Sequence, residues 1–122
     1  MTVLSKEALL AGGVNLRVER VTVARLNGDV FIREITGAER DQLEQWIANE
    51  NLKAQGKAVG LPNVRARVAW YVLADEEGNR LFKDVKQVEK LGDMPAQALD
   101  AIFEAGKRVN ALFEADEAVA KN

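Results

Sequence analysis

The acidic segment near the middle of the chain comes closest to a metal-binding motif. Asp75, Glu77 and Asn79 alternate there, as the ligands of a calcium-binding loop do. Such a loop also needs a glycine at its sixth position and a glutamate at its twelfth. Counted from Asp75, Gly78 stands at the fourth position and Lys86 at the twelfth. The segment is therefore predicted to be an ordinary acidic turn that binds no metal.

The composition excludes most enzyme chemistry. The chain has no cysteine and no histidine, so it lacks thiol nucleophiles, Ser-His and Cys-His pairs and the commonest zinc ligands. Carboxylate or lysine catalysis stays possible in principle, but no constellation in the sequence indicates it. The adjacent glycines Gly12 and Gly13 lack the further glycines and the lysine of a phosphate-binding loop. We expect neither catalysis nor a cofactor.

Nucleic-acid binding is the alternative that the arginines keep open. Arg65 and Arg67 precede Trp70 and Tyr71, and arginines beside aromatic rings can stack on bases. The net charge is only −2, however, and no basic stripe extends this patch. The predicted hairpin adds further arginines: Arg17, Arg20, Arg25 and Arg33.

The last predicted helix carries the first candidate protein-binding surface. It should begin around Pro95 and continue to roughly Glu117, about 30 Å at 1.5 Å per residue. In one interpretation its stripe is simply core. In the other it is a seam between helices, in which Gly106 lets a neighbour approach and Asn110 fixes the register. The stripe consists of Leu99, Ile102, Phe103, Gly106, Val109, Asn110 and Phe113.

A second candidate surface lies on an earlier helix. Thr36 and Glu39 form a capping box, which predicts a helix from there to about Glu50. Its apolar stripe is sparse and includes Trp46 and Ile47 beside Leu43, so one face should be solvated. We take Trp46 and Ile47 as candidate binding residues.

The remaining elements position these helices. Ser5 can cap a helix of about two turns that stops at the glycine pair, since glycine adopts a left-handed conformation easily. β-Branched segments at 15–26 and 30–35 flank Asn27-Gly28, which predicts a β-hairpin with a tight turn. The apolar alternation changes phase near Glu19-Arg20, where a bulge or strong twist is expected.

The middle of the chain is less regular. Residues 51–62 should form a mobile connection, and the apolar segment 64–74 fits a buried helix or a buried strand, with helix favoured. Leu81 and Phe82 should return to the core. Asp84 should cap a short helix that ends at Leu91-Gly92.

Together these elements predict an α+β fold, mostly α, in which an N-terminal β-hairpin packs with four to five helices. A single domain over residues 1–122 is expected, with the first helix and hairpin in 1–35 and the helical part in 36–122. No signal peptide or membrane-spanning run is present in the sequence, which favours the cytoplasm. Because an isolated hairpin leaves unpaired strand edges, self-association is expected as well.

The second half of the chain also resembles a known family. The similar residues are Val64-Arg65-Ala66-Arg67, Asp75 to Phe82, Val88 to Gly92, Pro95, Leu99 to Phe103, and Asn110. This pattern is similar to that of the tail assembly chaperones of lambda-like and HK97-like siphophages, and it covers about half of the chain.

The resemblance implies a binding function. A protein of this family would coat the hydrophobic tape measure protein before the tail tube forms, associate with itself along that template, and engage the tail tube protein. Such a chaperone needs apolar surfaces for a client helix. The candidate residues are Trp46, Ile47, Leu99, Phe103, Gly106, Asn110 and Phe113.

Overall fold

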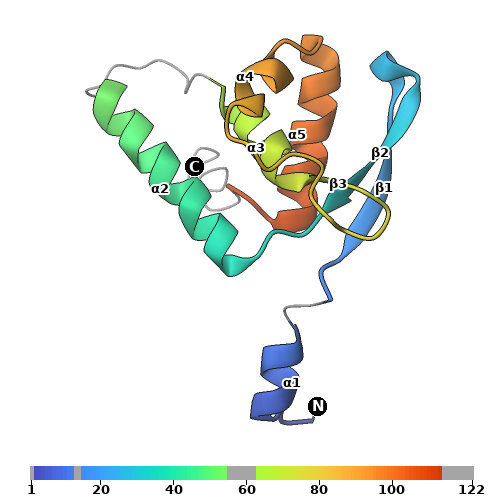
Figure 1. The fold of residues 1–122 in the computed structure, drawn as a ribbon, viewed down its shortest axis with the longest axis vertical. Coiled ribbons are helices and arrows are strands. Elements are labelled where there is room, and N and C mark those ends of the chain that lie inside the picture. Colours follow the sequence, from blue (N-terminus) through green and yellow to red (C-terminus); the bar gives the residue numbers. More distant parts are fainter. Residues whose placement is uncertain (1, 13–14, 55–62, 114–122) are drawn as a thin grey trace, which may run out of the picture.

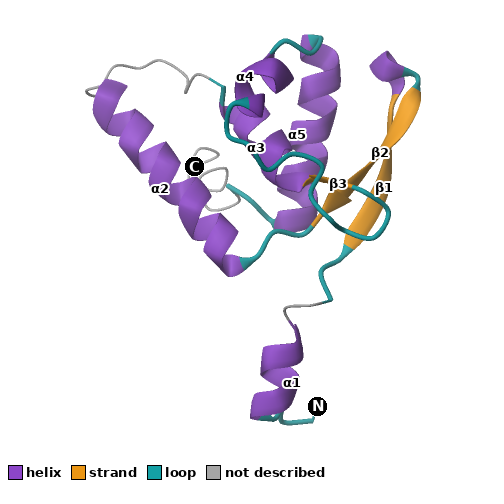
Figure 2. Ribbon diagram, viewed as in Figure 1, coloured by secondary structure: helices purple, strands orange, loops and turns teal. Residues whose placement is uncertain are grey.

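A computed structural model describes residues 2–12, 15–54 and 63–113. In these ranges the chain forms five α-helices, a short 3-10 turn and a three-stranded antiparallel sheet of order β1-β2-β3 (Figures 1 and 2). The predicted α+β class, mostly α, is confirmed. None of the helices in this part of the chain is long and apolar enough to cross a membrane.

The predicted hairpin consists of β1 (Val18–Val23) and β2 (Gly28–Arg33). The pairing runs without interruption from Val18 opposite Arg33 to Val23 opposite Gly28, so the bulge expected near Glu19-Arg20 is absent. The turn also differs from the tight turn expected at Asn27-Gly28. A 3-10 turn, η2 (Ala24–Leu26), precedes Asn27, whose φ is 54°, and Gly28 already belongs to β2. Asn27 alone supplies the left-handed residue that this longer loop needs.

The ambiguous segment 64–74 contains both alternatives. It forms helix α3 (Val64–Val72) and then strand β3 (Leu73–Ala74), which pairs with Phe31 and Ile32 of β2. The chain changes conformation at Leu73, whose φ and ψ are −69° and 128°. An apolar run buried on all sides satisfies either structure, so the pattern alone did not predict the third strand.

The capping box is confirmed at the start of α2 (Gly37–Ala54). The backbone N–H of Glu39 donates to the Thr36 hydroxyl at 3.1 Å, and the N–H of Thr36 donates to the Glu39 carboxylate at 2.9 Å. The helix extends beyond Glu50 to Ala54, so the expected mobile connection is wrong for 51–54. The rest of it, 55–62, lies outside the described residues.

The segment between β3 and α4 (Gln87–Gly92) packs through Phe82, whereas Leu81 is 52% exposed and does not return to the core as expected. Asp84 precedes α4 and accepts a hydrogen bond from the N–H of Lys86 at 3.0 Å. The residue at the N-cap position of α4 is Lys86, and no side chain caps this helix, so the expected cap at Asp84 is wrong. The predicted end of the helix at Leu91-Gly92 is confirmed.

Helix α5 (Ala96–Asn110) is shorter than predicted. Ala111 adopts a left-handed conformation with φ 52°, and its N–H bonds back to the Lys107 carbonyl, which ends the helix. The expected continuation is therefore wrong for 111–113, and 114–122 lie outside the described residues. Phe113 stands beyond the helix, and α5 is about 22 Å long.

The core joins the sheet to the helices. Helix α5 contacts both long strands on one side and α3 on the other. The side chains with the least exposure come from five elements, which shows that the hairpin and the helices share one core; they include Val23, Ile32, Leu43, Val68, Val72 and Ile102. Helix α1 (Lys6–Ala11) has no buried residue and stands apart from this core (Figure 1).

Candidate protein-binding surface

The structure divides the predicted binding residues into two groups. Leu99 and Gly106 are buried, and the side-chain amide of Asn110 is bonded inside the chain. The others keep part of their surface exposed while they pack against the core: Trp46, Ile47, Phe103 and Phe113. Only the second group can contact a partner without opening the fold.

Gly106 allows a close approach, as the sequence suggested, but the neighbour belongs to the same chain. A Cβ atom at Gly106 would lie 3.2 Å from methyl groups of Val68 and Val72 in α3. Glycine is therefore needed here for the packing of α5 on α3. In this structure the contact is made within the core.

Asn110 fastens the end of α5 to the end of β2. Its Oδ1 accepts a hydrogen bond from the N–H of Ile35 at 2.8 Å, and its Nδ2 donates to the carbonyl oxygens of Arg33 at 3.2 Å and Gly106 at 3.1 Å. All of these partners lie in this chain. The polar interruption of the stripe therefore fixes the position of α5 against the hairpin.

Phe103 and Phe113 form a pair at the half-exposed side of α5. Their ring centroids are 6.3 Å apart and the rings are tilted by 37°. The Arg65 guanidinium lies 5.6 Å from the Phe103 centroid, and the Lys107 ammonium lies 5.1 Å from it. Arg65 is also paired with Asp100 at 2.6 Å. Cations at these distances are attracted to the ring face and keep a charged rim around an apolar centre.

Trp46 forms the corresponding group on α2. The Arg67 guanidinium of α3 lies 4.9 Å from the Trp46 ring and 5.4 Å from the Trp70 ring, so it contacts a half-exposed and a buried indole. Ile47 is the next half-exposed apolar residue on this helix. We call Trp46 and Ile47 with Phe103 and Phe113 the aromatic surface.

Sequence reasoning missed the polar cluster around Glu39 at the start of α2. Glu39 accepts from both terminal nitrogens of Arg33, with contacts of 2.7 to 2.9 Å, and lies 3.4 Å from Arg80. The Arg80 guanidinium lies 4.2 Å from the Trp70 ring and donates to the Trp70 carbonyl at 3.1 Å. The capping box predicted the position of Glu39, but nothing local indicated its two arginine partners.

Burial and the charge of Glu39 act on the pKa of Arg80 in opposite directions. Burial lowers the pKa of Arg80, while the negative charge of Glu39 acts to raise it. For Tyr71, burial raises the pKa of the hydroxyl, which donates a hydrogen bond to the Gln42 side chain at 3.3 Å. The ion pairs of Glu39 with Arg33 and Arg80 join β2, α2 and the segment after β3.

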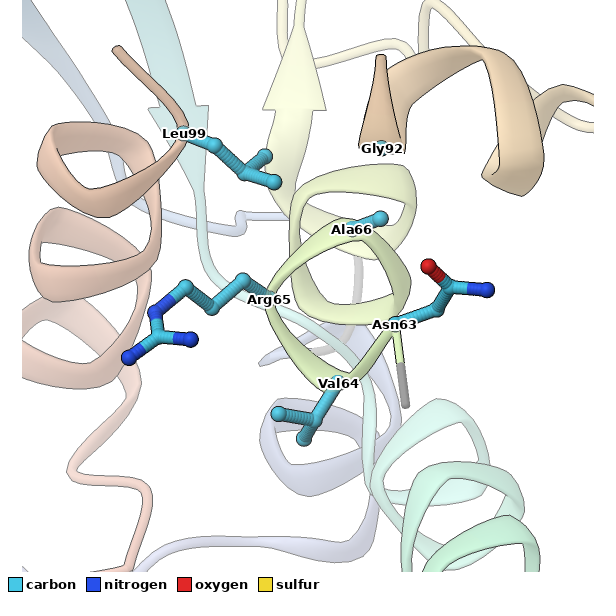
Figure 3. A pocket seen from close by; sticks show the side chains of 6 residues that line it. All are labelled: Asn63, Val64, Arg65, Ala66, Gly92 and Leu99. Atoms are coloured by element: carbon cyan, nitrogen blue, oxygen red, sulfur yellow. The ribbon is translucent and has the colours of Figure 1, made fainter. Parts of the chain in front are cut away.

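A shallow pocket of about 200 Å³ lies at the start of α3 (Figure 3). The Asn63 side chain makes no capping hydrogen bond at this helix start, and Arg65 extends toward α5. No carboxylate lines it, so it does not offer a catalytic pair. Its lining residues are Asn63, Val64, Arg65, Ala66, Gly92 and Leu99.

The acidic turn uses its carboxylate within the turn. Asp75 Oδ1 accepts from the N–H groups of Glu77 and Asn79 at 2.9 Å each, and these hydrogen bonds, above all those from Asn79, lower the pKa of Asp75. Gly78 has φ 89°, which the turn requires. Within the described ranges, no group of three or more acidic residues is placed to hold a metal ion.

Most arginines of the nucleic-acid alternative are engaged inside the chain. In the hairpin, Arg17 donates to the Val109 carbonyl at 2.8 Å, Arg20 pairs with Asp29 at 2.7 Å, and Arg33 pairs with Glu39. These contacts orient the guanidinium groups toward the protein itself. We therefore carry the protein-binding hypothesis forward.

A scan against protein-family models and searches of curated proteins and of solved structures found no match to this chain.

Proposed function

We propose that this chain is a tail assembly chaperone of a long-tailed bacteriophage. In this role it binds the tape measure protein in the host cytoplasm, keeps it soluble, and helps to recruit tail tube subunits. The proposal starts from the resemblance in residues 64–110. The observation that carries the binding mode is the aromatic surface. Its four apolar side chains are half-exposed, and cations lie against the rings of Trp46 and Phe103.

The aromatic surface suits a helical client. Phe103 and Trp46 are anchored on rigid helices, so a partner that covers them loses little side-chain entropy on their account. The surrounding cations leave the rim hydrated, which is the usual arrangement at a protein interface. An amphipathic client helix would place its apolar stripe on the rings and its polar side toward water.

The residues of the resemblance support the proposal in a different way. Arg80, Gly92 and Asn110 belong to the similar pattern. Arg80 and Asn110 make contacts that hold elements together, and a Cβ atom at Gly92 would lie 3.2 Å from the side chain of Asn63. We infer that the pattern specifies the scaffold, while the aromatic surface supplies the client contacts.

The test is co-expression with the tape measure protein encoded near this gene. The wild-type chain is expected to raise the soluble fraction of the tape measure protein and to co-purify with it. Trp46→Glu and Phe103→Glu should reduce both, because a carboxylate would be buried under the client. Leu52→Glu is the matched control, since Leu52 is a 75% exposed apolar residue of α2 outside the aromatic surface.

Circular dichroism and thermal unfolding must first show that each variant is folded. A wild-type chain that leaves the tape measure protein insoluble would reject the chaperone function. Folded Trp46→Glu and Phe103→Glu variants that still keep the client soluble would reject the aromatic surface while leaving the function standing.

A further inference from the structure

The N-terminal arm, residues 2–12, presents apolar side chains that no other described residue covers. Val3 is 92% exposed and Leu10 73%, and Leu4 and Leu9 are 62% and 63% exposed. No residue of α1 is buried, and the helix stands away from the core (Figure 1). Four large apolar residues within eight positions form an unusual concentration for a solvated segment.

The sequence of the arm nevertheless specifies a helix. Ser5 caps it, with its hydroxyl accepting from the N–H of Ala8 at 3.1 Å. Leu4 precedes the cap and Leu9 follows it by four positions, which is the spacing of a hydrophobic staple. A six-residue helix cannot sustain itself in water, because helices below about 12 residues are marginal even with good sequences. Contact with an external surface would stabilise it.

The exit of the arm is fixed by Arg17. The N–H of Arg17 donates to the Glu34 carboxylate at 2.6 Å, its carbonyl accepts from the N–H of Glu34 at 2.8 Å, and its guanidinium donates to the Val109 carbonyl at 2.8 Å. These bonds hold the chain at the start of β1. The helical part of the arm then leads away from the body, which favours contact with another molecule over folding back (Figure 1).

The body offers a matching acceptor. Leu81 and Val85 are 52% and 54% exposed and lie four positions apart, on either side of the half-buried Phe82. Among the described residues of the body, the other strongly exposed large apolar side chains are Leu26 and Leu52, which lie singly on separate elements. We call the segment 81–85 the acceptor loop.

We propose that the N-terminal arm of one copy of this chain docks on the acceptor loop of a second copy. Each arm offers on the order of 100 Å² of apolar surface for each of its four large side chains. Two arms exchanged between two copies, together with the surfaces that they cover, would bury roughly 1,600 Å² in total, which is the size of a standard protein interface. The arm carries one lysine and one glutamate, so the contact would be apolar and weakly dependent on salt.

This inference deepens the self-association that the proposed function requires, and it is tested on the purified chain without any client. Its failure and the failure of client binding are therefore distinguishable. Sedimentation equilibrium over a concentration series measures the dissociation constant of the wild-type chain. The double variant Leu9→Glu/Leu10→Glu should raise that constant by about 100-fold or more, because two apolar anchors are replaced by charges.

Two further variants complete the design. Lys6→Gln/Glu7→Gln changes the same helix without touching its apolar residues and should associate like the wild type. Val85→Glu should weaken association as the arm variant does. The arm makes no core contact, so the arm variants should unfold at the temperature of a wild-type sample diluted to the same monomeric state.

A cysteine pair gives a direct test, because the chain has no cysteine of its own. A tagged Leu9→Cys chain mixed with an untagged Val85→Cys chain should form a mixed disulfide between the two copies. A monomeric wild-type chain at every concentration would overturn the proposal. So would an association that persists unchanged in the Leu9→Glu/Leu10→Glu variant, or a Leu9→Cys/Val85→Cys chain that closes its disulfide only within one molecule.

Discussion

Removing the amide of Asn110 should destabilise the fold without acting through an interface. In Asn110→Ala, the N–H of Ile35 and the carbonyl of Arg33 lose the partners that now lie 2.8 and 3.2 Å away. A part-buried polar group left without a partner costs about 1 kcal/mol or more. The free energy of unfolding should therefore fall by about 2–3 kcal/mol, which lowers the melting temperature by roughly 10–20 °C in a domain of this size.

Urea unfolding followed by circular dichroism measures this change, with Asn49→Ala as the matched control. Asn49 is an exposed asparagine of α2 whose side chain bonds only to Gln45, at 3.1 Å, one helical turn away. Such a pair contributes about 0.5 kcal/mol or less. The difference between Asn110→Ala and the wild type should stay constant over about a hundredfold range of protein concentration, since the lost bonds are intramolecular.

Asn110→Asp separates the acceptor role from the donor role. Its carboxylate can still accept from Ile35, but it faces the carbonyl oxygens of Arg33 and Gly106, which the amide nitrogen now contacts. This repulsion should raise the pKa of the new carboxyl in the folded state. The free energy of unfolding of the variant should therefore be closest to that of the wild type at acid pH, and it should fall as the pH rises. An Asn110→Ala protein as stable as Asn49→Ala, or a deficit that changes with concentration, would refute the reasoning.

Three further predictions follow from the packing and the charges. Gly106→Ala should destabilise by about 1–3 kcal/mol, because its methyl group would press on two valines of α3, whereas Gly37→Ala, with nothing within 4 Å of the added atom, should be neutral or stabilising in urea unfolding. Glu39→Gln should cost about 3–5 kcal/mol by leaving a buried arginine without its counterion, while Glu44→Gln, which loses only an exposed pair at 3.9 Å, should unfold like the wild type. Asp75→Asn should be less stable than the wild type near neutral pH, and the two should converge as the pH falls through the lowered pKa of the Asp75 carboxyl, which thermal melts across pH 2–7 would follow.

Short sequence motifs predicted the starts of α1 and α2, because the hydrogen bonds that form a cap lie within a few residues of one another. The capping box at Thr36 and Glu39 and the cap at Ser5 are seen with the predicted hydrogen bonds, because cap and helix lie within three residues of each other. The strands of the hairpin were also found. Its turn was misread because Asn27-Gly28 is compatible with more than one loop, and the unbroken pairing excluded the expected bulge.

The features that were missed depend on distant residues. Arg80 reaches Glu39 from 41 positions away, and Asn110 reaches Ile35 from 75 positions away. No periodicity in either segment encodes such a partner. The early end of α5 has the same origin, since the helix stops where Asn110 is held against the hairpin and Ala111 turns left-handed.

The residues that hold the fold together are mostly different from those that leave apolar surface open. Arg80 and Asn110 belong to the pattern shared with tail assembly chaperones, and both are occupied inside the chain. Trp46 and the N-terminal arm lie outside that pattern and keep apolar surface open, and so do Phe103 and Leu81 within it. If selection keeps the scaffold and lets the contact surfaces follow their clients, the open apolar residues should determine which tape measure protein is bound. Exchanging those residues between two such chaperones, with the scaffold residues left in place, should then exchange their clients.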